Sequence, residues 1–545
     1  MSIPLKAYGP HRILLLCIFL LLIAVGILSF IVPPSIDADP CWGFLVMHNM
    51  GTGHPFNTLL SPDITNIAHS HYEFLSWWSP GQYLVPYLFK ALFNLNIGHM
   101  VVITVIVCNL LGLAGFYLLF KQLGFTKWIA ALSVAFIATQ SFFLLPFVYF
   151  MGGEVVLFAF IGWFLYGCFS IKKVTWPVLL FIFIAGLSGF FAKSSFLWMY
   201  AAGMVCIWFN VSINETIEHP EYKSKSNPAA LTRCLKKQAA RWLKNAALLA
   251  IPFICALIVI YVFYLSKNDN PTSDQGPMLV RAETFGFPLA SPVLSGFSVD
   301  ELTGGLLDQP VNPALTYHMA ILLVYIAAFC SLAYQLLIIK LWPDKRYKLA
   351  SIAFYAVATV FFSYMYLKQA TISYEARHFR IVGILCIPGF IYLCYKTKVG
   401  RVAFFLLWFA FIYGSYNGIK ERFKENSVAA RGVSDLSQPG YDKATLAEIE
   451  RLDASHHNNA IFMVMCPDIA IEIQHNRIIP LDDDTPNDVI ASLKYAGKAG
   501  TIYILIPENY VANGRRATLI KSFISYHHFK FKRLSPGYEL CYANS

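Results

Sequence analysis

Two aspartates stand where chemistry at a membrane face is possible. Asp37 and Asp39 follow directly after the apolar run 13–32. A carboxylate just outside a membrane helix can remove a proton from a hydroxyl group as a general base, and nearby charges and helix ends tune its pKa. Two solvated loop acids are the alternative, and the spacing alone does not decide between these interpretations.

A third acid and a lysine stand at the predicted ends of later membrane helices. Glu154 begins the apolar run 154–171, where the positive end of the helix favours an acid even without any chemistry. Lys193 lies in a tight turn between two runs. It can offer a point charge to a phosphate group, or simply extend to the membrane interface.

The segment 374–380 brings one acid, two guanidinium groups and an imidazole together. Arg377 and Arg380 can each bind a phosphate through parallel hydrogen bonds, and His378 stands between them. Their position on a face with few basic residues favours an anionic ligand. An internal ion pair between Arg377 and Glu375 is the competing explanation.

Metal ligands are only weakly indicated. His69, His71 and Glu73 are residue types that bind metals. Without a fixed turn to bring them together, this spacing is weak evidence for a site. We therefore expect no cofactor. A divalent metal is compatible with the sequence without being indicated by it, and these three residues are its weak candidates.

The composition excludes a soluble globular protein. Of the 545 residues, 57% are hydrophobic and 13% are charged, whereas soluble domains are about 45–50% apolar. The formal net charge is +11, but the basic residues lie mainly in short loops, so we expect contacts with membrane lipids and no nucleic-acid partner. About eleven apolar runs have the length of a membrane helix, at residues 13–32, 99–120, 128–150, 154–171, 175–192, 196–210, 246–266, 318–341, 349–367, 379–395 and 402–417.

The positive-inside rule orients these runs. With the N-terminus on the cytoplasmic side, most of the basic loops are cytoplasmic as well. The segments 33–98 and 267–317 and the tail 418–545 then lie on the opposite side. The segment 267–317 is long and rich in Pro and Gly, which favours a functional lid.

The tail has a different pattern from the rest of the chain. Helix and strand candidates alternate over 418–545, which predicts a small α/β domain with a partly parallel sheet. Cys466 and Cys541 both fall in this tail and can pair if it lies in an oxidising compartment. The sequence leaves this disulfide open.

In their order and topological side, these motifs resemble those of the polytopic C-type (GT-C) glycosyltransferases. The similarity is closest to the branch of aminoarabinose lipid A transferases and protein O-mannosyltransferases. Asp37-Ala-Asp-Pro resembles the acidic motif after the first span, and Glu154 stands at the second acidic position. Lys193-Ser resembles a Lys-Gly turn, and Arg377-His resembles an Arg-Tyr motif. The segment 78–83 stands where many members have a His-Pro-Pro-Leu-Tyr-like sequence.

The resemblance covers residues 6 to about 393. It implies an α-helical polytopic membrane domain over 1–417 in the cell inner membrane, with the α/β tail outside the cytoplasm. It also implies inverting transfer of a sugar from a polyprenyl-phosphate-linked donor to a lipid, glycan or protein acceptor. Asp39 or Asp37 would deprotonate the acceptor, and Glu154 would orient the acceptor or the base. The donor phosphate would be held by four basic residues: Lys193, Arg377, His378 and Arg380.

Two other classes of function remain open at this point. A transporter or flippase for lipid-linked sugars is the main alternative, and a non-catalytic membrane scaffold is another. Transporters usually show paired repeats and polar or broken helices at mid-membrane. Here the apolar runs are nearly free of interior charge, and the polar groups gather at one face. This pattern favours chemistry at the interface.

Overall fold

The computed structural model describes residues 9–218, 228–268, 276–307, 315–456, 459–465, 467–481 and 485–545. The chain forms two compact units. The helical unit comprises Met1–Ile23, Val107–Leu144 and Glu154–Ile419, and the mixed unit comprises Ala24–Ile106, Leu145–Gly153 and Lys420–Ser545. Segments far apart in the sequence therefore belong to the same unit.

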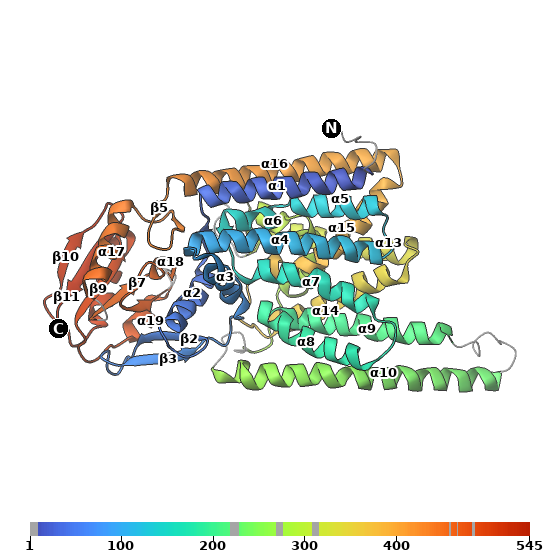
Figure 1. The fold of residues 1–545 in the computed structure, drawn as a ribbon, viewed down its shortest axis with the longest axis horizontal. Helices are drawn as coiled ribbons and strands as arrows, with labels where there is room; N and C mark the ends of the chain where they lie inside the picture. Colours follow the sequence, from blue (N-terminus) through green and yellow to red (C-terminus); the bar gives the residue numbers. More distant parts are fainter. Residues whose placement is uncertain are drawn as a thin grey trace. The chain divides into compact units, whose positions relative to one another are not determined.

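Long apolar helices make up the helical unit (Figure 1). Four of its helices, α1, α4, α7 and α16, have residues in both units. The helices are α1 (Pro10–Ile31), α4 (Ile97–Gln122), α5 (Lys127–Ala138), α6 (Ser141–Leu144), α7 (Gly153–Ser170), α8 (Trp176–Ala192), α9 (Phe196–Glu218), α10 (Pro228–Phe263), α11 (Ala282–Gly296), α12 (Val299–Leu302), α13 (Tyr317–Leu341), α14 (Lys345–Leu367), α15 (Arg380–Tyr395) and α16 (Lys398–Val428), with 3₁₀ turns η4 (Leu265–Lys267) and η6 (Ala376–Phe379).

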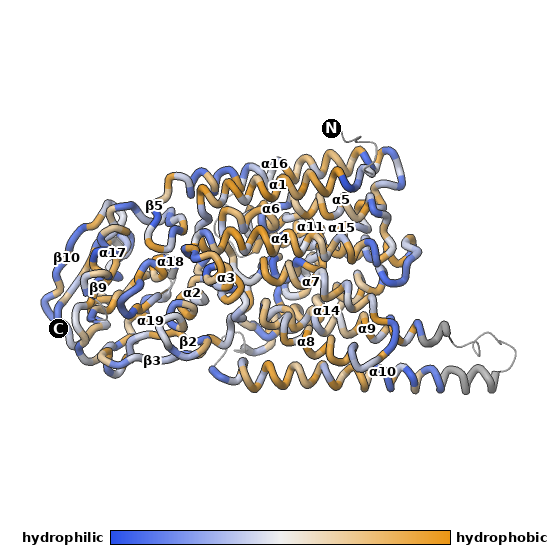
Figure 2. The backbone as a smooth tube through the Cα atoms, viewed as in Figure 1, coloured by the Kyte–Doolittle hydropathy of each residue, from blue (hydrophilic) through white to orange (hydrophobic). Residues whose placement is uncertain are grey.

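The predicted membrane helices are confirmed in kind. Within the described residues, nine helices are long and apolar enough to cross a membrane, or ten if the pair Lys127–Ala138 and Ser141–Phe147, bent by 68°, is one span. The remaining predicted run is the shorter apolar helix α8. Figure 2 shows hydrophobic residues along most of these helices. The protein is therefore a multi-pass membrane protein.

Helix α11 lies in the segment for which the sequence predicts a lid. Its residues Phe287 and Leu294 are buried, and the helix packs against α13, α14 and α15. Gly296 and Gly383 let the backbones of α11 and α15 touch, because a side chain on Gly383 would lie 2.3 Å from the backbone nitrogen of Gly296. Over residues 282–296, the segment predicted as a lid is therefore a helix that packs within the helical unit.

The tail contains the predicted α/β arrangement. Its five-stranded sheet has the order β10-β11-β9-β7-β8, with β7 parallel to β8 and β9, and with β11 antiparallel to β9 and β10. The strands are β7 (Ala460–Val464), β8 (Arg477–Pro480), β9 (Thr501–Pro507), β10 (Lys530–Arg533) and β11 (Tyr538–Ala543). The helices are α17 (Lys443–His456), α18 (Pro467–Ala470), α19 (Asn487–Ser492), α20 (Glu508–Ala512) and α21 (Arg515–Lys521).

The segment between the first two apolar runs is folded as well. It contains α2 (Ala38–Gly51), the antiparallel hairpin of β2 (Thr58–Pro62) and β3 (Ser70–Phe74), and α3 (Gly81–Phe93). Short pairs complete the unit: β1 (Ser35–Ile36) runs parallel to β4 (Tyr149–Phe150), which follows the turn η2 (Leu145–Phe147), and β5 (Ala430–Arg431) runs antiparallel to β6 (Ser437–Gln438).

The hairpin is tied to the sheet of the tail. Ile67, in the loop between β2 and β3, is fully buried in one hydrophobic core with Ile461 and Met463 of β7. The Ile67 amide donates to the Ala496 carbonyl at 2.9 Å, and the Ala496 amide donates to the Ile64 carbonyl at 2.9 Å. The first connecting segment and the tail therefore share one core.

This shared core gives a matched pair of substitutions. Ile67→Ala should lower the free energy of unfolding of the mixed unit by about 2–5 kcal/mol, because it leaves a cavity in a packed core. Ile64→Ala, in the same loop but 46% exposed, should change it by no more than about 0.5 kcal/mol. The measurement is a urea titration that follows, by peptide mass spectrometry, labelling of the Cys541 thiol buried in that core. Equal midpoints for the two variants would contradict the shared core.

Candidate functional site

Asp37 is held by two segments of the mixed unit. Its backbone amide donates to the Phe150 carbonyl at 3.0 Å and so extends the β1–β4 pairing. Its side chain caps the N-terminus of α2, where Oδ1 accepts from the Asp39 amide at 3.1 Å. The Tyr149 hydroxyl donates to Oδ2 at 2.6 Å. Burial and the neighbouring Asp37 carboxylate raise the pKa of Tyr149, so this phenol stays protonated and remains a donor.

Asp39 lies in the first turn of α2 and is partly exposed. The unpaired amides at the start of a helix favour a negative charge there. The guanidinium of Arg422 lies over the Tyr149 ring, 5.0 Å from its centroid. The two predicted acids therefore lie side by side at a helix N-terminus, and the hydroxyl of Tyr149 donates a hydrogen bond to one of them, Asp37.

Gln82 packs closely beside this helix end. It is 4% exposed, and its amide Nε2 has no hydrogen-bond partner among the described residues. A side chain on Gly43 would lie 3.2 Å from Nε2, and one on Gly152 would lie 2.9 Å from Oε1. Gly152 also has φ +79°, so both glycines make room for this amide. The sequence singles out neither Gln82 nor Tyr149, because neither residue type in isolation signals an acid's partner.

In the helical unit, two cations converge on Glu154. The Lys193 ammonium donates to Oε1 of Glu154, and Nη1 of Arg377 lies 3.8 Å from the same oxygen. The three side chains are only 15–24% exposed. Glu154 comes from the first turn of α7, Lys193 follows the last turn of α8, and Arg377 lies in η6. The structure thus brings together three residues that the sequence predicts separately.

Arg377 also forms the internal pair that the sequence offers as an alternative. Its guanidinium pairs with Glu375, and Glu375 accepts from the Ser373 hydroxyl at 2.6 Å. That hydroxyl lies 3.4 Å from Nε2 of His378, whose ring stacks on Phe362. Two carboxylates therefore balance the charges of Lys193 and Arg377.

Arg380 has its own partners. It pairs with Glu301 and lies over the Phe142 ring, 4.1 Å from its centroid. The neighbouring Asp300 accepts from the amides of Leu306 and Ala376 at 2.9 Å each. Burial and then the adjacent Glu301 raise the pKa of Asp300 to about 6. No sequence pattern marks Asp300 and Glu301, because they lie in a stretch rich in Pro and Gly.

The weak metal candidates do not form a cluster. His71 and Glu73 lie in β3 opposite Ser61 and Leu59, and His69 precedes the strand. In the parts of the chain that the structure describes, no group of three or more His, Cys, Asp or Glu side chains could hold a metal. Cys466 lies outside the described residues, so its pairing with Cys541, which the sequence leaves open, stays untested.

Sequence comparisons give no relative. No protein-family model matches the chain, and no curated protein sequence matches it.

Comparison of structures finds similar folds. The archaeal oligosaccharyltransferase AglB from Archaeoglobus fulgidus, in complex with an inhibitory peptide and a dolichol-phosphate, is 14% identical, with a TM-score of 0.50 over 97% of this chain and 74% of that one. The chain has the GT-C fold. ArnT from Cupriavidus metallidurans bound to undecaprenyl phosphate is 11% identical, with a TM-score of 0.48 over 97% of this chain and 98% of that one.

The cluster on Glu154 predicts a strong energetic coupling. Lys193→Met should lower the free energy of unfolding by about 3 kcal/mol, because it leaves the mostly buried Glu154 without one of its cations. The double variant with Glu154→Gln should recover most of this loss. Denaturant titration in detergent gives the coupling energy.

The control is an exposed ion pair of the same unit. Arg346 pairs with Asp344 at 2.9 Å, and its side chain is 44% exposed. Arg346→Met should therefore cost no more than about 1 kcal/mol. If Lys193→Met lowered the free energy of unfolding by no more than this control does, the cluster on Glu154 would contribute little to the stability of the fold.

Proposed function

We propose that this protein is a glycosyltransferase that transfers a sugar from a polyprenyl-phosphate-linked donor to an acceptor, with inversion at the anomeric carbon. The observation that carries the proposal is the convergence of Lys193 and Arg377 on one oxygen of Glu154. An ammonium and a guanidinium, both mostly shielded from water, form a binding site for a phosphate group. The likeness in fold to AglB, whose structure holds a dolichol-phosphate, supports this assignment.

The carboxylates of this cluster have a role in the absence of the lipid. Two cations left unpaired in a mostly buried position would be costly. Glu154 and Glu375 balance them, and an arriving phosphate replaces part of this balance. His378, beside Ser373 and Arg377, adds a hydrogen-bonding group, and Arg380 holds the neighbouring turn through Glu301.

The acceptor is activated by an aspartate of α2. We assign the base first to Asp39, in the first turn of α2, with Asp37, whose two oxygens accept hydrogen bonds, as the second candidate. The base takes the proton of the acceptor hydroxyl or amine. The acceptor atom then bonds to the anomeric carbon, the bond from that carbon to the phosphate oxygen breaks, and polyprenyl phosphate leaves. Glu154 orients the acceptor or the base.

The positive-inside pattern assigns the sides of the membrane. We propose that the protein lies in the cell inner membrane with its N-terminus in the cytoplasm, and that transfer takes place on the outer face. The acceptor is a lipid, glycan or protein that reaches this face.

Lipid-phosphate binding gives the first test. In lipid nanodiscs, the protein should bind a polyprenyl monophosphate, and Lys193→Ala and Arg377→Ala should each weaken this binding by about tenfold or more, because each removes a charged hydrogen bond worth about 1.5–3 kcal/mol. Calorimetric or fluorescence titration gives the dissociation constants.

A matched arginine controls for net charge. Arg346→Ala also removes one guanidinium from the helical unit, but from an exposed pair, so binding should stay within about twofold of the wild type. Absence of binding in the wild type would move the assignment to a scaffold. Binding followed by movement of the intact lipid-linked sugar across the membrane would indicate a flippase.

The base assignment has a kinetic test. With a panel of polyprenyl-phosphate sugars and a cell-envelope extract as the acceptor, Asp39→Asn should lower the rate of polyprenyl phosphate release by about 10²–10⁴-fold, because an amide cannot take up the proton. Lipid binding should be retained. If neither Asp39→Asn nor Asp37→Asn slowed transfer, the base would have to be another residue.

A further inference from the structure

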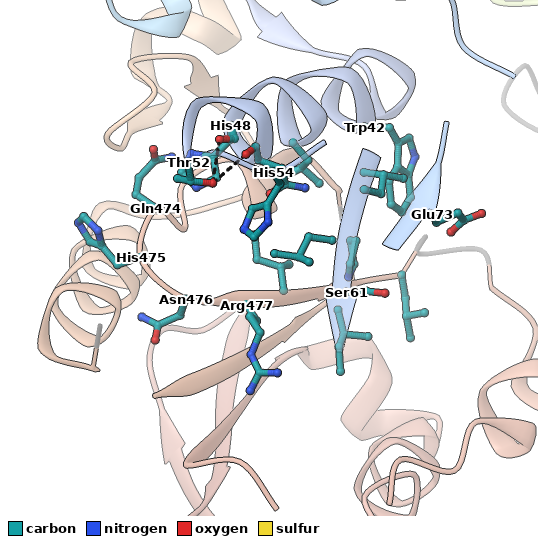
Figure 3. A pocket seen from close by; sticks show the side chains of 18 of the residues that line it. Trp42, His48, Thr52, His54, Ser61, Glu73, Gln474, His475, Asn476 and Arg477 are labelled. Carbon is teal, nitrogen blue, oxygen red and sulfur yellow. Dashed lines mark hydrogen bonds between the residues drawn. The ribbon is translucent and has the colours of Figure 1, made fainter. Parts of the chain in front are cut away.

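The mixed unit contains a cavity that the proposed chemistry does not use. Its volume is about 460 Å³, within the range of about 300–1,000 Å³ typical of ligand pockets. Three elements form its walls: α2, the β2–β3 hairpin and β8, the edge strand of the sheet. Figure 3 shows Trp42 towards one end of α2 and His48 and Thr52 towards the other, with the ring of His54 between α2 and β8.

Hydrogen bonds hold these walls at a fixed separation. Arg477 of β8 donates to the Ile67 carbonyl at 2.7 Å and to the His69 carbonyl at 3.3 Å. The side-chain amide of Asn49 on α2 donates to the Thr58 carbonyl of β2 at 3.3 Å. Together with the buried Ile67, these bonds tie the hairpin to both other walls. The cavity is therefore preformed, which lowers the cost of ordering on binding.

The lining next to α2 combines one large aromatic ring with uncharged polar groups, and Glu73 of β3 adds a carboxylate to the cavity. Asn49 follows Trp42 by about two helical turns, Thr52 follows Asn49 by about one, and His48 and His54 add two imidazoles. Burial and the nearby Lys90 lower the pKa of His48, so its ring is neutral near pH 7 and offers one donor and one acceptor. In Figure 3 the side chain of Arg477 points away from α2. Its guanidinium donates to the backbone carbonyls of Ile67 and His69.

We propose that this cavity binds a carbohydrate portion of the acceptor, an inference that rests on the proposed function. A sugar ring has an apolar face of C–H groups and a rim of hydroxyls. An indole ring beside neutral donors and acceptors matches both. An alkyl chain would cover these polar groups without adding a hydrogen bond to any of them, which is less favourable than contact with hydroxyls. The site is distinct from the reacting centre and selects the acceptor.

Helix α2 connects this cavity to the proposed base. Trp42 comes three residues after Asp39, so it lies about 4.5 Å further along the helix axis, and Thr52 lies about 20 Å from Asp39 by the same rise of 1.5 Å per residue. A glycan of several rings that lies along α2 can therefore reach from Thr52 past Trp42 towards Asp39. A single sugar cannot fill both positions.

A second hollow extends the binding surface. It has a volume of about 270 Å³ and shares Leu45, His48, Thr52 and Gln474 with the first. It also contains Lys90 of α3. A longer acceptor glycan can continue into this hollow, where an acidic substituent would meet the ammonium.

Binding of free oligosaccharides tests the inference. The full-length protein in nanodiscs is mixed with neutral and acidic oligosaccharides of defined sequence, and saturation-transfer NMR reports which of them bind. Trp42→Ala should weaken the binding of those that bind by at least about tenfold, and Trp42→Phe should restore most of it, because the aromatic face returns. Trp176→Ala, which removes a tryptophan 73% exposed in the helical unit, should have no effect.

Polyprenyl monophosphate binding is measured on the same samples. If the wild type binds the lipid but no oligosaccharide, or if Trp42→Ala leaves oligosaccharide binding unchanged, this inference is overturned and the proposed function stands. If the wild type fails to bind the lipid, that result contradicts the proposed function, whatever the oligosaccharides do. A Trp42-dependent signal from a random peptide library in place of the oligosaccharides would make the cavity a peptide site and overturn the inference.

Discussion

The helical unit depends on the cost of leaving a charge unpaired where little water reaches it. Its mostly buried cations, Lys193, Arg377 and Arg380, each have a carboxylate partner. The pairs with Glu154 join the turn after α8, the first turn of α7 and the turn before α15, and the pair of Arg380 with Glu301 joins α15 to α12. Because removing one partner of such a pair is strongly destabilising, the same contacts that permit burial also fix the geometry of the candidate site.

Glycines set a second constraint, which is how closely neighbouring backbones and side chains can approach one another. Gly296 and Gly383 allow backbone contact between α11 and α15, and Gly43 and Gly152 leave room for the amide of Gln82. Small residues at helix contacts are typical of membrane proteins, where packing replaces much of the hydrophobic drive. In this chain they also determine which polar group can stand beside the acids of α2.

The sequence is sufficient for some of this structure and insufficient for the rest. Apolar runs are a local signal, so the membrane helices and most of the alternating elements of the tail are predictable, whereas the strand β11 (Tyr538–Ala543) is not among the predicted ones. The order of acidic and basic motifs likewise predicts the GT-C fold. The contacts of Tyr149 with Asp37 and of Arg477 with Ile67 span 112 and 410 residues. No local period encodes such a pairing, so the partner of Asp37, the shared core and the cavity become visible only in three dimensions.

The burial of Ile67 in the sheet of the tail has a consequence for how the chain is made. During synthesis the hairpin leaves the ribosome long before strands β7 and β9 exist, and contacts of such sequence separation form late. Until then, Ile67 lacks the core that buries it and the hairpin lacks Arg477. The segment that carries the two aspartates thus reaches its native setting only after strands β7 and β9 have been made and have folded.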